Sequence, residues 1–433
     1  MNDNTSLHLP AIEPTANAAL AARLQQRIDN KTKPLGALGR LETLALQLGL
    51  IQRSEAITFQ SPQMVVFAAD HGIASEGVSA FPQAVTLQMV GNMLAGGAAI
   101  NVFARQHGFE LQVVDAGVAG ELAAHPQLLQ RKVAPGTANI CESPAMSMAQ
   151  AVQALHTGMA VVKDLPGNVV AFGEMGIANT SPAALLLARL AGLPVSEVVG
   201  RGTGLDDIQL AHKQVVLKRA LARHADVHEP LAVLASLGGF EIAMMTGAML
   251  QAASERRVVL VDGFIAGAAA LVACALQPAA KDYLVFCHRS AERGHHLLLA
   301  YLQAAPLLDL DMRLGEGTGA LLAWPLLQSA SLFLAEMASF DSAGVSGKAE
   351  APTLVTACTS LPPEGTHFAL GRPGGETLAP TLVTACTSLP PEGAHFALGR
   401  PGGETLAPTL VTACTSLPPE GAHFALGRPG GET

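Results

Sequence analysis

The sequence predicts an α/β fold: a Rossmann-like parallel sheet with helices on both faces. Five short runs are nearly continuously apolar and rich in β-branched residues, and each is followed by Gly or polar residues and then by a helix-compatible stretch. Apolar strands that alternate with helices are typical of a parallel sheet covered on both sides. Right-handed crossovers wind such units into a Rossmann-like domain. The predicted strands are residues 64–70, 111–117, 168–176, 258–264 and 283–289.

Helical segments flank the predicted sheet in the sequence. Residues 17–52 favour a helix pair, and residues 320–340 favour another apolar helix, so we expect a small helical domain built from both ends. The long spacing around residues 195–250 leaves room for a helical subdomain or further strands. The predicted domains are a helical segment at 1–60, a catalytic domain at 61–305, the rest of the small domain at 306–347 and a repeat tail at 348–433.

The tail contains three near-identical copies of one segment. Residues 351–378 recur at 379–406 and, without the final Leu, at 407–433. The Pro and Gly content of each copy predicts a mostly disordered, non-catalytic tail. The alternative is a binding array whose spaced ligands are Cys358, Cys386 and Cys414.

Composition limits the function classes. A net charge of −9 argues against a nucleic-acid binder, which usually has a basic face. No Cys-x-x-Cys motif occurs, which excludes a zinc ribbon. The N-terminus lacks the basic and apolar regions of a signal peptide, so a cytoplasmic location is expected. Residues 263–280 and 319–340 approach the length of a membrane span. Their small and polar residues also suit helices packed inside an α/β core, and no span is expected.

Four of the five predicted strands end at a carboxylate. In open α/β sheets, ligands bind beyond the carboxyl ends of the strands. The four acidic residues are Asp70, Asp115, Glu174 and Asp262, and the fifth strand leads into His288, Arg289 and Ser290. Asp and Gly are also ordinary turn residues, but the convergence of the set favours a site.

Two Gly-rich loops, residues 200–204 and 315–319, suit anion binding. Glycine lets backbone N–H groups approach an anion, and a helix N-terminus adds positive potential. Neither loop is a Walker A motif or a dinucleotide fingerprint, so a tight turn with a helix cap is the alternative for each. The second loop holds Glu316 at the start of an apolar helix. The helix dipole favours its charged form whereas burial raises its pKa, and a carboxylate with a pKa near neutrality suits a general base.

Six motifs occur in order between residues 10 and 347. They are KTKPLGALGRLE (31–42), AADHGIASEGVSAFPQAVTLQMV (68–90), GEMGIANTSPAA (173–184), VGRGTGLDD (199–207), VDGFIAGAAAL (261–271) and LDMRLGEGTGAL (310–321). Together they resemble the nicotinate-nucleotide–dimethylbenzimidazole phosphoribosyltransferase family, in which the tail has no counterpart. The resemblance implies transfer of ribose 5-phosphate from nicotinate mononucleotide to 5,6-dimethylbenzimidazole, giving α-ribazole 5′-phosphate and nicotinate in cobalamin biosynthesis. It also implies a homodimer that needs no metal or other cofactor.

The resemblance assigns roles to particular residues. Glu316 is the implied general base, and Glu174 lies near the reacting ribose, where we hypothesise that its carboxylate stabilises oxocarbenium character. The phosphate is expected on Gly202, with Lys213 as counter-charge. Further implied substrate contacts are Gly176, Asp262, Gly263 and Ser290. The implied slot for the aromatic base contains Ser79, Gln83 and Gln88, with Leu314 as a lid.

Some alternatives stay open at this level. Which of Gln83 and Gln88 faces the base is undecided, as is the preferred base. A nucleotide-dependent oxidoreductase would need the missing dinucleotide fingerprint. A catalytically inactive binding or scaffolding protein would use the repeat tail as its interaction module. The single Asp262, where pyrophosphate-dependent phosphoribosyltransferases show an acidic pair, argues against a Mg²⁺-bound pyrophosphate leaving group.

Overall fold

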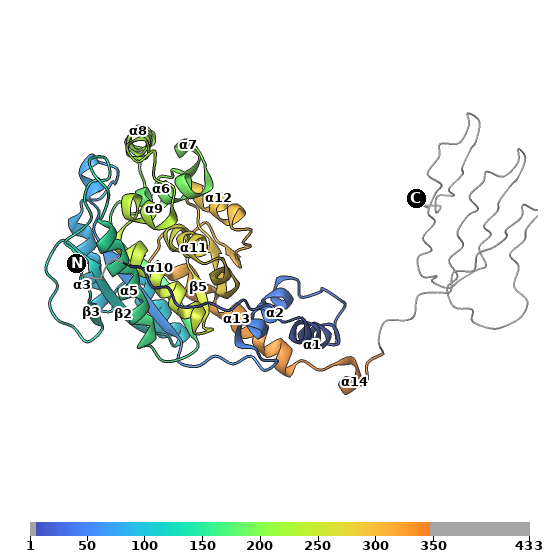
Figure 1. Ribbon diagram of the computed structural model, residues 1–433. Helices are drawn as coiled ribbons and strands as arrows, with labels where there is room; N and C mark the ends of the chain where they lie inside the picture. Colours follow the sequence, from blue (N-terminus) through green and yellow to red (C-terminus); the bar gives the residue numbers. More distant parts are fainter. Residues whose placement is uncertain (1–5, 347–433) are drawn as a thin grey trace, which may run out of the picture. The chain divides into compact units, whose positions relative to one another are not determined.

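A six-stranded parallel sheet lies at the centre of this computed structural model, which describes residues 6–346 (Figure 1). The strand order is β3-β2-β1-β4-β5-β6, which is the Rossmann order. The strands are β1 (Gln63–Ala69), β2 (Glu110–Gly117), β3 (Leu128–Gln130), β4 (Val169–Met175), β5 (Val258–Val261) and β6 (Leu284–Phe286). The predicted fold class is therefore confirmed. The predicted repeat tail at 348–433 lies outside the described residues.

The sheet matches the predicted strands except at its edges. Strand β3 was not predicted, because three residues are too few to give an apolar pattern. The predicted run 283–289 divides into β6 and β7 (His288–Arg289), and β7 pairs with β8 (Leu308–Asp309) in a separate two-stranded sheet. The run 258–264 ends as a strand at Val261, since the next helix begins at Phe264.

Helices cover the sheet in two layers. On one side α10 packs against four strands and against α5 and α11, and on the other α13 packs against β4, α2 and α4. The helices are α1 (Ala18–Asp29), α2 (Arg40–Gln52), α3 (Ala84–Leu94), α4 (Ala99–His107), α5 (Met148–Lys163), α6 (Thr180–Ala191), α7 (Val195–Val198), α8 (Asp207–Arg223), α9 (Pro230–Leu237), α10 (Phe240–Ser254), α11 (Phe264–Leu276), α12 (Arg293–Tyr301), α13 (Thr318–Glu336) and α14 (Phe340–Ala343). The region 195–250 is thus helical. Short 3-10 helices span Gly72–Glu76 and Pro278–Tyr283.

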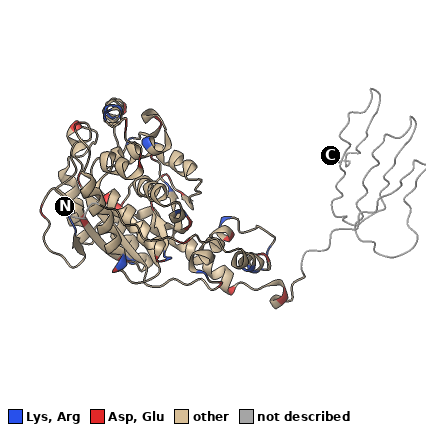
Figure 2. Ribbon diagram, in the orientation of Figure 1, with Lys and Arg blue, Asp and Glu red and all other residues tan. Residues whose placement is uncertain are grey.

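Charged residues are sparse over the sheet and its covering helices (Figure 2). Every residue of β1 is buried, and α10 and α11 are buried along most of their length. Helices that are apolar all round belong in a core. These buried helices explain much of the high content of hydrophobic residues in this chain, which is 49%.

Two segments, 84–107 and 318–336, are long and apolar enough to cross a membrane by length and composition. In the fold, the first comprises the separate helices α3 and α4. The second is α13, which packs against β4 and two helices. The predicted apolar segment 263–280 contains α11, which has 13 residues and is too short. Packing inside the α/β unit explains these helices, and the absence of a span stays a prediction.

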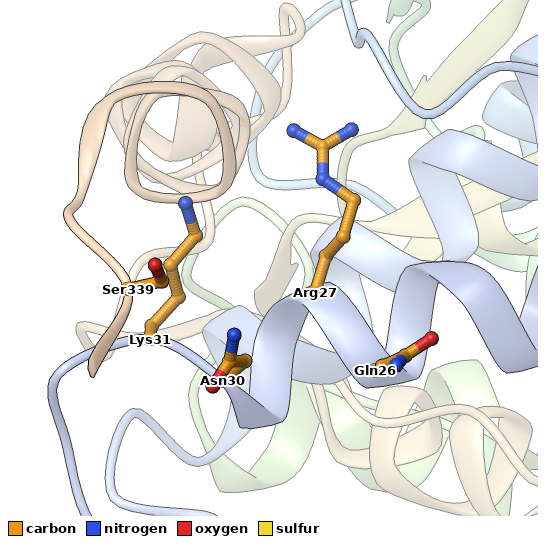
Figure 3. Close-up of a pocket in the computed structure, with 5 residues that line it drawn as sticks. All are labelled: Gln26, Arg27, Asn30, Lys31 and Ser339. Atoms are coloured by element: carbon orange, nitrogen blue, oxygen red, sulfur yellow. The ribbon is translucent and has the colours of Figure 1, made fainter. Parts of the chain in front are cut away.

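A helix from the N-terminal part of the chain, α2, lies beside α13, the last long helix of the described residues (Figure 1). Helix α2 packs against both α1 and α13, as the predicted pairing required. Lys31 Nζ donates to Met337 O at 2.6 Å, and Arg27 donates to Leu334 O at 3.4 Å, so cations from the N-terminal segment cap the last carbonyls of α13. A hollow of about 310 Å³ lies there (Figure 3), lined by Gln26, Arg27, Asn30, Lys31 and Ser339. Among the described residues, those up to Val345 form one compact unit, and the domain boundaries inside it stay a prediction.

Candidate active site

The carboxyl ends of β1 and β4 form the point where strand order reverses, which is the usual ligand crevice of this topology. Phe67 of β1 pairs with Glu174 of β4, so the acidic residue lies at this edge. A Cβ on Gly176 would lie 2.5 Å from Ala69 O. Glycine at 176 therefore lets the end of β4 turn tightly against β1.

The loop that carries Glu316 rests directly on β4. A Cβ on Gly173 would lie 2.2 Å from Glu316 O, and a Cβ on Gly315 would lie 2.2 Å from Glu174 Oε1. These two glycines let the loop backbone and the Glu174 carboxylate approach each other. The structure therefore brings together Glu174 and Glu316, the two predicted catalytic residues.

Glu316 is only 4% exposed and has a left-handed backbone, with φ of +63°. Its Oε2 accepts a hydrogen bond from the backbone N–H of Ile100 at 3.1 Å. Burial raises its pKa, the charge of Asp262 adds to the rise, and the Ile100 hydrogen bond opposes it. The raised pKa agrees with the prediction. The helix N-terminus that contacts the carboxylate is α4, however, and not the expected helix at 320.

Glu174 is buried beside a hydrogen-bond donor, because Asn179 Nδ2 donates to its Oε2. Burial raises the pKa of Glu174 to about 8, with the Asn179 hydrogen bond opposing and with Asp262 and other carboxylates adding repulsion. In the substrate-free protein Glu174 is therefore mostly protonated at pH 7. A positive charge placed nearby would favour its ionised form.

Asp262 holds the start of α13 in place. Its Oδ2 accepts from the N–H of Gly317 at 3.2 Å, and its Oδ1 accepts from the N–H of Ala320 at 3.1 Å. His288 Nε2 lies 3.5 Å from Oδ1 and 3.0 Å from where a Cβ on Gly263 would be. Asp262 thus fixes the backbone that follows Glu316. Its predicted contact with the ribose, like that of Gly263, stays a prediction.

The predicted phosphate residues also converge. Lys213 is 1% exposed, and its Nζ donates to Thr180 Oγ1 at 2.7 Å. A Cβ on Gly202, whose φ is +52°, would lie 3.4 Å from Lys213 Nζ, so the ammonium lies against this glycine. Arg313 Nη1 donates to Gly202 O at 3.0 Å and joins the loop to the segment before Glu316. Ser290 Oγ accepts from the N–H of Glu292 at 3.3 Å.

The predicted residues of the aromatic slot are more dispersed. Ser79 Oγ lies 3.4 Å from Thr203 Oγ1, which belongs to the Gly-rich loop 200–204. Gln83 is half-buried at the start of α3, and Gln88 is exposed on that helix. Leu314 is 59% exposed. Within residues 6–346, no hydrogen bond joins Gln83, Gln88 or Leu314 to either carboxylate.

Comparisons with known proteins agree with this geometry. A family model described as phosphoribosyltransferase matches residues 13–345. A protein of Variovorax paradoxus is 58% identical over 340 residues, which cover 78% of this chain and 97% of that protein. A protein of Cupriavidus necator is 60% identical over 343 residues, which cover 78% of this chain and 99% of that protein. Both are named nicotinate-nucleotide–dimethylbenzimidazole phosphoribosyltransferase.

This chain belongs to the nicotinate-nucleotide–dimethylbenzimidazole phosphoribosyltransferase family. The crystal structure of CobT from Thermus thermophilus superposes with a TM-score of 0.74 at 46% identity, over 76% of this chain and 99% of that one. The resemblance read from the six motifs is confirmed. The family match supports neither the oxidoreductase nor the catalytically inactive binding protein.

Sequence reasoning missed several partners of the candidate site residues of this phosphoribosyltransferase family member. Asn179 and Thr180 lie inside a motif that was noticed, but nothing in it marks them as partners of Glu174 and Lys213. Glu241 binds His71 at 2.8 Å in a fully buried pair at the end of β1. Its position at the start of the apolar helix α10 gave no signal. Glu292, which is also buried, was likewise unmarked.

Three of the buried carboxylates, those of Asp262, Glu316 and Glu174, have hydrogen-bond donors. Backbone N–H groups donate to Asp262 and Glu316, and Asn179 donates to Glu174. Among residues 6–346, no group of three or more His, Cys, Asp or Glu side chains is arranged to hold a metal ion. The arrangement suits proton transfer and charge stabilisation at a bound substrate.

Proposed function

We propose that this chain transfers ribose 5-phosphate from nicotinate mononucleotide to 5,6-dimethylbenzimidazole, as its relatives' names state for them. The observation that carries the proposal is the buried Glu316 carboxylate, with its raised pKa, at the carboxyl end of β4. A carboxylate whose pKa is raised is a stronger proton acceptor than an ordinary one, as a general base requires. The products are α-ribazole 5′-phosphate and nicotinate, and the reaction serves cobalamin biosynthesis.

The chemistry needs one base. A benzimidazole nitrogen attacks C1′ of the ribose, and the C1′–N bond to the pyridinium ring breaks, with its electron pair returning to that ring. Nicotinate leaves without a proton. The other benzimidazole nitrogen loses its proton to Glu316. Inversion from the β-nucleotide to the α-product follows from direct displacement on opposite faces.

Glu174 supplies a negative charge opposite the positive charge of the substrate. A pyridinium or oxocarbenium centre beside this buried carboxyl lowers its pKa from about 8, so that the group loses its proton and becomes a counter-charge. We place the ribose of nicotinate mononucleotide between Glu174 and Glu316, with Gly176, Asp262 and Gly263 at its edge.

Replacing Glu174 by Gln is expected to lower kcat by about 10²-fold, the usual cost of removing one electrostatic stabiliser of a transition state. The amide keeps the shape of the carboxyl group but cannot become negative. Steady-state kinetics at saturating substrates measures the effect. Glu197→Gln, an exposed acid in α7, is the matched control and should leave kcat unchanged. An unchanged kcat in the Glu174 variant would remove this residue from the reaction.

The remaining assignments form part of the same proposal. We place the phosphate on the amides around Gly202, with Lys213 as counter-charge and Ser290 nearby. We place the aromatic base near Ser79, Gln83 and Gln88, with Leu314 closing over it. The homodimer and the cytoplasmic location rest on the family resemblance. Sedimentation equilibrium of the purified protein tests the dimer.

The deciding experiment is an assay of the purified chain with nicotinate mononucleotide and dimethylbenzimidazole, without added metal. We expect nicotinate release to match the formation of α-ribazole 5′-phosphate. A folded protein that forms no product would refute the proposed reaction for this chain. Product from benzimidazole, adenine and phenolic bases, compared at equal concentration, then defines the preferred base.

A further inference from the structure

A buried carboxylate, that of Glu292, lies against the Gly-rich loop 200–204, the proposed phosphate site. Glu292 immediately precedes α12 and is 6% exposed. A Cβ on Gly200 would lie 2.0 Å from Glu292 Oε2, so the carboxylate is packed against the first glycine of the loop. Its side chain makes no cap for its own helix. Among the described residues, Glu292 Oε2 is a buried oxygen without a hydrogen-bond partner.

The loop lies against Glu292 at one glycine and against Lys213 at another. Gly200 contacts the Glu292 carboxylate, and a Cβ added to Gly202 would lie 3.4 Å from the Lys213 ammonium. Burial raises the pKa of Glu292, and the charges of Lys213 and Arg313 and the backbone N–H of Gly202 oppose that rise. In the described part of the chain, Lys213 and Glu292 form no direct ion pair. The two opposite charges therefore act on each other at the loop, in a region of low dielectric constant.

Lys213 needs such a partner to stay charged. Its side chain is buried, and its hydrogen bond to the neutral Thr180 hydroxyl supplies no negative charge. Burial disfavours an ammonium ion. Burial lowers the pKa of Lys213 to about 8, and Glu292 is the charge that opposes this decrease.

We propose that Glu292 is a positioning residue for the phosphate of the nucleotide: its buried carboxylate keeps the Lys213 ammonium charged and holds the Gly200–Gly204 loop over it. This inference rests on the proposed function, since it takes the loop to be the phosphate site. Glu292 itself touches no reacting atom. Its negative charge sustains the positive charge that the phosphate requires.

The charged groups around the pair are few. Lys213 lies on α8 and faces Thr180 of α6, Glu292 and the Gly202 backbone. Glu292 faces Lys213 and, from the segment before α13, Arg313. The phosphate itself titrates near pH 6. That titration is the same in wild type and variant, so it cancels when the two proteins are compared.

Glu292→Gln is the informative variant, because the amide keeps the shape and the acceptor but removes the charge. If the Lys213 pKa falls by about one unit, kcat/KM for nicotinate mononucleotide should fall roughly tenfold at pH 9 and stay near wild type at pH 6. The loss should appear in KM, with kcat at saturating nucleotide close to wild type. Calorimetric binding of ribose 5-phosphate should show the same pH-dependent weakening without turnover.

Two controls separate charge from packing. Asp207→Asn removes an acid just after the same loop, at the start of α8, and the Asp207 side chain is 89% exposed. The kcat/KM of this variant should equal that of wild type at every pH. In a Lys213→Met background, adding Glu292→Gln should no longer give a pH-dependent loss. A loss of equal size at pH 6 and pH 9, or no loss, would overturn the inference. A wild-type protein without turnover would instead refute the proposed function, and the ribose 5-phosphate titration would still test Glu292.

Discussion

Replacing Glu316 by Gln is expected to lower kcat by about 10²–10⁴-fold, the range for loss of a general base. Gln keeps the size of the side chain and an oxygen that accepts from the Ile100 N–H, so the loop should keep its place. It cannot take the benzimidazole proton at neutral pH. Stopped or continuous assays of nicotinate release at saturating substrates, together with an unfolding curve, measure the two expectations.

The pH profile gives a second reading of the same variant. Burial raises the pKa of Glu316, and a base works only when deprotonated. Wild-type kcat should therefore fall as the pH drops through that raised pKa, and the Gln variant should lack this acidic limb. Glu336→Gln, an exposed acid near the end of α13, is the control and should behave as wild type. A Glu316 variant within a few fold of wild type would mean that the proton leaves by another route.

Replacing Gly173 by Ala is expected to damage both activity and stability. The new Cβ would lie 2.2 Å from Glu316 O and 2.4 Å from Glu316 C. Both atoms belong to backbone, so no side-chain rotation can relieve the clash. Overpacking of this kind costs about 1–3 kcal/mol of the free energy of unfolding. A displacement of the base by about 1 Å is enough to lower kcat about 10²-fold.

Denaturant unfolding and kinetics of the same preparation test the Gly173 variant. Gly91→Ala is the control, because a Cβ there meets nothing within 4 Å on an exposed face of α3, and it should be neutral or slightly stabilising. The activity of Gly173→Ala should be low at temperatures where the protein is still folded. A folded variant with wild-type kcat would show that the Glu316 loop need not rest on β4.

The fold can be predicted from the sequence because the patterns that indicate its strands and helices are local. Apolar runs followed by helix-compatible stretches predicted five strands, all of which occur, and the parallel sheet follows from their alternation with helices. The helix pair near the N-terminus and the apolar helix after residue 320 were predicted on the same grounds. Strand β3 escaped because three residues show no period.

The sequence also indicated which residue types carry the chemistry. Glu174, Asp262 and Glu316 are candidates because they end strands or lie between glycines. All three are buried close to the carboxyl end of β4. The identity of each role came from the resemblance and not from the pattern. The pattern alone gave Asp262 the same standing as Glu174, whereas the structure gives it backbone partners at the start of α13.

What each carboxylate touches was decided only by the tertiary structure. Ile100 is 216 positions from Glu316 in the chain. Glu292, just before α12, acts on Lys213 of α8, although the two residues are far apart in the sequence. Such pairs depend on which chain segments the sheet order places side by side, and no local period records that. The pKa of Glu174 and the charge of Lys213 depend on burial and on distant carboxylates for the same reason. The sequence by itself determined the fold and the set of reactive groups, and three-dimensional packing determined their environments, because burial and charge act through space.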